Sequence, residues 1–251
     1  MLFVWYKVSF DEKWSHGSAV CETVYFFVEF VCVFPWKCVS LNNQNRGKIM
    51  DGILRKLPIG IQTFEKLREG DYLYVDKTAL VWRIASTETP YFLSRPRRFG
   101  KSLLLSTFEA YFEGKKELFE GLAIADMEKE WKTYPVFHLD LNAEKYDSPQ
   151  ALVEILSRQL TQWELKYGKG EDEETLSGRF AGVIRRASEQ ADRGVVVLVD
   201  EYDKPLLQAL GDDALLDDYR KTLKAFYGVL KSSDRYLRFV FLTGVTKFAQ
   251  V

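Results

Sequence analysis

The stretch TPYFLSRPRRFGKSLLLSTF, residues 89–108, joins a short apolar run, a basic loop and the start of an amphipathic segment. The apolar run at 89–94 predicts a β-strand. Apolar residues at helical spacing after Lys101 predict a helix that stops at Gly114. A strand that passes through a short loop into a helix is a building unit of α/β folds. The loop at 95–100 is therefore expected to lie at the amino end of a helix.

The loop ends in Gly-Lys-Ser, residues 100–102, which closes the phosphate-binding pattern G-x-x-x-x-G-K-[ST]. The glycine lets backbone N–H groups turn toward an anion, and the helix start adds a partial positive charge. In this chemistry Lys101 contacts the β- and γ-phosphates, and Ser102 offers a hydroxyl ligand to Mg²⁺. The junction is therefore predicted to bind a nucleotide through its phosphates.

The entrance of the loop departs from the usual pattern. Arg95 occupies the place of the first glycine, and Pro96 lacks a backbone N–H. The three arginines of the loop can compensate, because guanidinium groups pair with phosphate oxygens in a bidentate way. The same arginines equally suit a solvated or partner-facing surface. The residues predicted to bind the nucleotide are Arg95, Pro96, Arg97, Arg98, Phe99, Gly100, Lys101, Ser102 and Leu103.

The chain beyond this stretch alternates short apolar runs with longer amphipathic segments, which is typical of a parallel sheet with crossover helices. We therefore predict a three-layer α/β fold of the P-loop NTPase class with a mainly parallel sheet. Such a domain normally continues further, so the chain is expected to be incomplete at its C-terminus. Further strands are predicted at 135–142, 195–199 and 237–248, and helices at 149–168, 176–194 and 215–232.

Two acids close the apolar run VVVLVDE, residues 195–201. Asp200 is predicted to bind the metal together with Ser102, and Glu201 to polarise an attacking water. We therefore expect the acidic strand to adjoin the strand that precedes the phosphate loop. The alternative is that both acids merely end a strand. Because loop and acids occur together, the sequence favours hydrolysis of a γ-phosphate.

Weaker candidates lie at other strand ends. Thr243 could have a functional role, in which it contacts the γ-phosphate or orients water. The alternative is that its hydroxyl merely ends a strand. Asp203 and Lys204 are expected to form a local charge pair or a helix cap. His138 and Asp140 alternate onto one strand face, but two residues do not make a metal site, so a structural or supporting role is expected.

The overall charge indicates that any site for a polyanion is local. Lys and Arg number 35 against 36 Asp and Glu, which leaves a formal net charge of -1. Such a balance provides no global field that attracts nucleic acid or an anionic membrane. With 251 residues and 47% hydrophobic content, the chain is long enough for one α/β domain plus an appendage.

The first 49 residues differ from the rest and are predicted to be an appendage to a domain at 50–251. They hold all three cysteines, whose spacing does not suit zinc and indicates free thiols in a reducing compartment. The apolar segment 24–34 includes Glu29 and has 11 residues, too few to cross a bilayer. An interfacial or signal-like segment is the alternative, but acids rather than a basic leader precede it, which argues against export. We therefore expect a cytoplasmic protein without a membrane span.

Four blocks of the sequence together resemble the predicted AAA-ATPase-like family of bacterial P-loop proteins. The resemblance covers roughly 57–248 and implies that ATP is the ligand and that Arg95 is a group trait. The blocks are LPIGIQTFEKLREGDYLYVDKT (57–78), RPRRFGKSLLLSTFEAYF (95–112), VVVLVDEYDKPLL (195–207) and FLTGVTKF (241–248).

The resemblance also implies roles for single residues. Lys101 and Ser102 resemble the phosphate and magnesium residues of the family, and Asp200 and Glu201 resemble its metal-binding and water-activating acids. Thr243 resembles a sensor residue only loosely. Family members commonly continue into a domain resembling PD-(D/E)xK nucleases, which this chain does not reach. A nucleic-acid partner is implied only through this association.

The leading functional expectation is ATP binding with slow Mg²⁺-dependent hydrolysis, which would serve as a nucleotide switch or motor for a larger assembly. Glu201, Lys101 and Thr243 are the expected catalytic residues. No lid domain or trans-acting arginine can be assigned in the sequence, so a regulatory scaffold with little turnover is the main alternative. A third possibility is a kinase for a nucleotide or another small molecule. Self-association and a protein partner both remain open.

Overall fold

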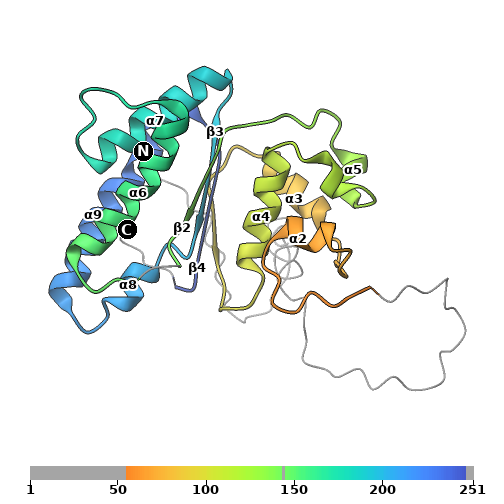
Figure 1. The fold of residues 1–251 in the computed structure, drawn as a ribbon, viewed down its shortest axis with the longest axis horizontal. Helices are drawn as coiled ribbons and strands as arrows, with labels where there is room; N and C mark the ends of the chain where they lie inside the picture. Colours follow the sequence, from red (N-terminus) through yellow and green to blue (C-terminus); the bar gives the residue numbers. More distant parts are fainter. Residues whose placement is uncertain (1–54, 143–144, 247–251) are drawn as a thin grey trace, which may run out of the picture.

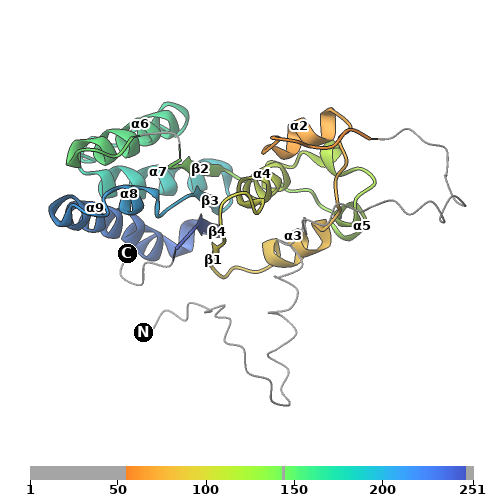
Figure 2. The ribbon, with the colours of Figure 1, turned by 90° about the horizontal axis from the view of Figure 1, so that it is seen from below.

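The computed structural model describes residues 55–142 and 145–246 as a parallel sheet with helices on both faces (Figures 1 and 2). The three-layer α/β class predicted from the sequence is confirmed. The elements are α2 (Phe64–Glu69), α3 (Thr78–Ala85), β1 (Tyr91–Ser94), α4 (Lys101–Phe112), η1 (Lys116–Phe119), α5 (Ala123–Met127), β2 (Val136–Asp140), α6 (Pro149–Tyr167), α7 (Leu176–Ala191), β3 (Val195–Asp200), α8 (Lys204–Gln208), α9 (Asp213–Ser232), η2 (Asp234–Tyr236) and β4 (Leu237–Gly244).

The four described strands lie in the order β1-β4-β3-β2, and each neighbouring pair is parallel. Their carboxyl ends therefore meet at one edge of the sheet, where the chain also turns from β1 into α4 (Figure 1). The expectation that the acidic strand adjoins the strand of the loop is wrong, because β4 lies between β1 and β3. A crossover connection can skip a lateral position, so sequence order does not fix neighbours in a parallel sheet.

The central strand β3 is buried along its whole length, as expected for a parallel strand covered on both faces. Val195, Val197 and Val199 belong to the core beneath α6, α7 and α9. Val196 and Leu198 belong to the opposite core, beneath α4. This alternation directs the side chain at position 200 toward the α4 side, at the carboxyl edge of the sheet.

The predicted helices after β2 occur close to their expected positions. The strands β1, β2 and β4 are shorter than predicted, whereas β3 extends one residue further, to Asp200. Two short helices before β1, α2 and α3, were not predicted. They have six and eight residues, too few for a clear periodic signal. The predicted appendage at 1–49 and the last two residues of the predicted strand 237–248 lie outside the described residues.

Candidate functional site

The loop between β1 and α4 has the backbone shape that its glycine allows. Gly100 precedes the helix with φ +74°, a left-handed conformation that favours glycine. A Cβ atom at Gly100 would meet nothing within 4 Å, so backbone conformation rather than space selects the glycine. Arg98 also has a positive φ, of +67°. The first turn of the twelve-residue helix α4 thus opens directly onto the loop.

Lys101 turns back into the loop instead of pointing to solvent. Its side chain is 4% exposed, and its Nζ donates to the carbonyl oxygens of Arg95 at 3.1 Å and Pro96 at 3.3 Å. The same Nζ forms an ion pair with Oε1 of Glu201 at 3.1 Å. The structure therefore brings the predicted phosphate-binding lysine into contact with the predicted water-activating acid.

Asp200 lies at the centre of a hydroxyl network. Its Oδ2 accepts a hydrogen bond from Ser102 Oγ at 2.6 Å, and its Oδ1 accepts one from Thr243 Oγ1 at 2.5 Å. Asp200 is 4% exposed and Thr243 is fully buried. Ser102 lies in the first turn of α4 and Thr243 belongs to β4, so the carboxylate of Asp200 joins this helix to the strand that separates β1 from β3.

Glu201 follows β3 in a left-handed backbone conformation with φ +53°. Its N–H donates to Thr243 Oγ1 at 3.4 Å, and the residue is 9% exposed. A non-glycine residue in this region costs about 1–3 kcal/mol and persists only where its surroundings impose it. The turn after β3 therefore fixes the direction of this carboxylate, toward Lys101.

The residues present suit Mg²⁺ shared with a phosphate ligand. Ser102 and Asp200 offer a hydroxyl and a carboxylate oxygen side by side, and Mg²⁺ prefers oxygen ligands in sites completed by phosphates and water. Among residues 55–142 and 145–246 there is no group of three or more His, Cys, Asp or Glu residues that would hold a metal. A cage built from protein side chains alone is thus not found in this part of the chain.

The remaining loop residues divide into a buried and an exposed part. Arg95 is partly buried, its N–H donates to the carbonyl oxygen of Gly244 at 3.0 Å, and its Nε is buried without a partner among the described residues. Leu103, in the first turn of α4, is partly buried. Both readings of the arginine cluster stay open, because the rest of the loop faces solvent: Pro96, Arg97, Arg98, Phe99 and Gly100.

Asp203 and Lys204 do not behave as expected. Asp203 makes no side-chain cap to α8, and its carboxylate accepts hydrogen bonds from Val245 and Thr246 instead. Lys204 Nζ contacts Oδ1 of Asn142 at 3.4 Å. The expected charge pair or cap is therefore wrong, because the turn after β3 directs Asp203 across to the end of β4. The sequence draws attention to Asp203 but does not indicate its hydrogen-bond partners, Val245 and Thr246.

His138 is paired across the layer boundary with Glu109 of α4. Its Nδ1 lies 2.9 Å from Oε2 of Glu109, and its Nε2 is buried without a partner in the described part of the chain. Burial lowers the pKa of His138, but the hydrogen bond to Glu109 and the negative charges of Glu109, Asp200 and Asp140 outweigh it, so the net shift is upward. The structural or supporting role expected for His138 remains a prediction, and Glu109 is the residue that His138 contacts.

This pairing predicts a pH-dependent stability. The pKa of His138 is higher in the folded chain than in the unfolded chain. Its contribution to the free energy of unfolding is therefore fully present below the unfolded pKa of about 6.5 and is lost as pH rises through the folded pKa. The difference in free energy of unfolding between wild type and His138→Gln should be larger at pH 5.5 than at pH 8.5. Urea unfolding at both pH values measures it. A difference that grows with pH would contradict the pairing, and Glu109→Gln should abolish the same dependence.

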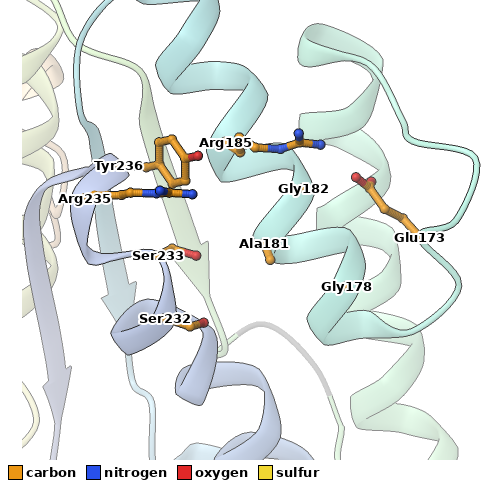
Figure 3. A pocket seen from close by; sticks show the side chains of 9 residues that line it. All are labelled: Glu173, Gly178, Ala181, Gly182, Arg185, Ser232, Ser233, Arg235 and Tyr236. Atoms are coloured by element: carbon orange, nitrogen blue, oxygen red, sulfur yellow. The ribbon is translucent and has the colours of Figure 1, made fainter.

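A separate pocket of about 320 Å³ lies between α7 and the junction of α9 with η2 (Figure 3). Arg235 and Ser233 line one wall, and Arg185 lines the other. Glu173 also borders it, but this carboxylate is held by Arg186. The pocket is at the amino end of β4, away from the loop, and includes none of the predicted site residues. Its mixed charges indicate no single class of ligand.

Fold and site together define a class of protein. A parallel strand, a Gly-Lys-Ser loop and a helix, with acids at the carboxyl end of another strand, make up the architecture of P-loop proteins. The chain belongs to the family described as "Predicted AAA-ATPase", whose model matches residues 58–251. The family resemblance inferred from the sequence is thereby confirmed.

The chain is similar to a protein of Azotobacter chroococcum mcd 1 described as "Uncharacterized protein in vnfD 5'region". The two are 42% identical over 198 residues, which is 78% of this chain and 38% of that protein. The chain thus spans well under half of its relative's length. No solved structure matches the chain. No helix in the described part of the chain is both long and apolar enough to span a membrane.

Proposed function

We propose that this chain binds ATP with Mg²⁺ and hydrolyses it slowly, as a nucleotide switch or motor within a larger assembly. The observation that carries the proposal is the connected network of Lys101, Glu201, Ser102 and Asp200 at the carboxyl edge of the sheet. Lys101 and Ser102 begin α4, whereas Asp200 ends β3 and Glu201 follows it, about 100 positions later in the sequence. Their chemical types are those that binding and cleaving a nucleoside triphosphate requires.

Each residue has a proposed role. Lys101 would exchange its contact with Glu201 for the β- and γ-phosphates, which leaves the Glu201 carboxylate free to orient and deprotonate a water. Ser102 and Asp200 would hold Mg²⁺, which supplies neutralisation of phosphate charge. Thr243 would keep Asp200 in position through its 2.5 Å hydrogen bond, a more indirect role than contact with the γ-phosphate. The exposed loop residues 96–100 would surround the phosphates.

The domain assignment belongs to the same proposal. We assign the ATPase unit to residues 50–251 and treat 1–49 as an appendage. The role in a larger assembly is supported by the relative, which is much longer than the region it shares with this chain. A protein partner or self-association would supply the lid and the arginine that cannot be assigned here, and a cytoplasmic location suits an ATP-dependent unit.

A regulatory scaffold with little turnover is the second candidate. The observation that favours it is the buried ion pair between Lys101 and Glu201, whose side chains are 4% and 12% exposed. While this pair persists, neither the ammonium nor the carboxylate is available to a substrate. A slow or partner-dependent exchange of the pair would give binding without efficient hydrolysis.

Phosphate release from ATP, measured with Mg²⁺ and without any added acceptor, tests the proposal. We expect phosphate and ADP to appear in equal amounts, and chelation of Mg²⁺ to stop the reaction. ATP binding without phosphate release would support the scaffold instead. Phosphate transfer that needs an added small molecule would identify a kinase, and failure to bind ATP would contradict the proposal altogether.

A further inference from the structure

The turn at residues 244–246 begins with the last residue of β4 and is held from the side of β3 by the carboxylate of Asp203. Oδ2 of Asp203 accepts hydrogen bonds from the backbone N–H of Val245 at 2.9 Å and of Thr246 at 2.6 Å. It also accepts one from Oγ1 of Thr246 at 2.7 Å. The hydroxyl of Tyr202 donates to the carbonyl oxygen of Thr246 at 3.1 Å. The segment after Glu201 therefore fixes the path on which the chain leaves β4.

The same turn is held from the side of the phosphate loop. Oγ of Ser94 donates to the carbonyl oxygen of Val245 at 2.9 Å, and the N–H of Arg95 donates to the carbonyl oxygen of Gly244 at 3.0 Å. Since β4 lies between β1 and β3, this turn connects the start of the phosphate loop with the turn after β3 that contains Glu201 and Asp203. A shift of the turn would move Thr243, Arg95 and the Asp200 hydrogen bond together.

Asp203 is buried, so its carboxylate depends on hydrogen-bond donors from the protein. The residue is 0% exposed, and none of its described contacts is an ion pair. Its Oδ1 is buried without a partner among residues 55–142 and 145–246. A carboxylate in this environment is stabilised only by the donors on its other oxygen, and burial without donors is costly. The three hydrogen bonds to the turn are therefore what holds Asp203 in place.

Gly244 packs closely against the same residues. A Cβ atom at this position would lie 2.6 Å from the ring of Tyr202 and 2.8 Å from Oδ1 of Asp203. Such contacts are too short, so even a methyl group would displace the turn or the acid. The turn and Asp203 fit each other closely, directly beside Thr243.

We propose that Asp203 is a positioning residue of the site, which holds turn 244–246 so that Thr243 stays against Asp200 and Arg95 stays at the entrance of the phosphate loop. This inference rests on the proposed function, since it assigns Asp203 to ATP hydrolysis. Asp203 touches neither Lys101 nor the predicted metal ligands in any hydrogen bond of the described residues. Its effect on the reaction would be transmitted entirely through the turn.

The first test compares Asp203→Ala and Asp203→Asn by kcat for phosphate release and by ATP affinity. Removal of a partner that orients a ligand typically costs about 10- to 100-fold in activity, so Asp203→Ala should lower kcat by about that factor. ATP affinity should fall by a smaller factor than kcat, because Lys101 and the other phosphate-binding groups remain. Asp203→Asn keeps an oxygen facing the two backbone N–H groups and should recover most of the rate. Asp218→Ala, an exposed acid on α9, is the matched control.

Hydrogen exchange of the Val245 and Thr246 amides gives a readout that does not depend on activity. Both should exchange faster in Asp203→Ala than in wild type, and near the wild-type rate in Asp203→Asn. Gly244→Ala disturbs the same turn without removing the carboxylate, so it should reproduce the loss of kcat and the faster exchange. Gly228→Ala serves as its control, because a Cβ atom there meets nothing within 4 Å.

The outcomes separate this inference from the proposed function. Wild-type protein that releases no phosphate would contradict the proposed function and the role of Asp203 with it. If wild type hydrolyses ATP and Asp203→Ala and Gly244→Ala leave kcat unchanged, the positioning role alone is refuted. A loss of stability and of ATP affinity without any loss of kcat would also overturn it, since it would show a merely structural residue.

Discussion

Glu201→Gln is expected to reduce phosphate release from ATP by about 100-fold or more, the range over which a positioned general base contributes. The amide keeps the volume of the side chain and a contact for Lys101, but it cannot take a proton from water. ATP affinity should remain equal or increase, because Lys101 loses its ion pair with Glu201 and becomes available to the phosphates. Steady-state phosphate release and equilibrium ATP binding measure the two effects separately.

The control for this variant is Glu189→Gln, an exposed glutamate on α7 that is remote from the carboxyl edge of the sheet. It should leave both rate and affinity unchanged. If Glu201→Gln retained the wild-type rate, Glu201 could not be the water-activating residue, and the ion pair with Lys101 would be purely structural.

Phe108→Ala should lower the free energy of unfolding by about 3–5 kcal/mol, the usual cost of emptying a buried aromatic site. Phe108 is 0% exposed on α4, and its ring centroid lies 5.1 Å from that of Phe239 and 5.0 Å from that of Phe241. These contacts attach α4 to β4, so the variant removes packing beneath the helix that carries Lys101 and Ser102. Urea unfolding followed by circular dichroism provides the measurement.

Val153→Ala on α6 is the matched control for the core. Val153 is 41% exposed, so its loss should change the free energy of unfolding by about 0.5 kcal/mol or less. An effect of Phe108→Ala below about 1 kcal/mol would mean that the site refills by repacking and that α4 is not anchored through this ring.

Local signals explain why much of the fold could be predicted. Ser148 and Pro149 mark the start of a helix, and α6 begins at Pro149 as expected, although the serine hydroxyl makes no cap hydrogen bond. The five consecutive apolar residues at 195–199 predicted β3, which is buried on both faces. The lateral order of the strands could not be predicted, because it depends on how each crossover packs on the sheet.

The residues of the candidate site were easier to predict than their contacts. Lys101, Ser102, Asp200 and Glu201 follow from short motifs in which residue type and spacing reflect the chemistry. The hydrogen bond from Thr243 to Asp200 joins residues 43 positions apart and exists because β4 lies beside β3. The partners of Asp203 depend on the same lateral order, so a local charge pair was the natural but wrong expectation.

The central claim is that Lys101, Asp200 and Glu201 belong to one ATP site. The most direct measurement is the ATP affinity of wild type, Lys101→Ala and Lys224→Ala with Mg²⁺. Lys224 is an exposed lysine on α9 and controls for the loss of a positive charge. Circular dichroism of each variant confirms that it is folded. We expect Lys101→Ala to bind ATP about 10- to 100-fold more weakly, the equivalent of about 1.4–2.8 kcal/mol, and Lys224→Ala to bind like wild type. Equal ATP binding by folded Lys101→Ala and wild type would contradict the account.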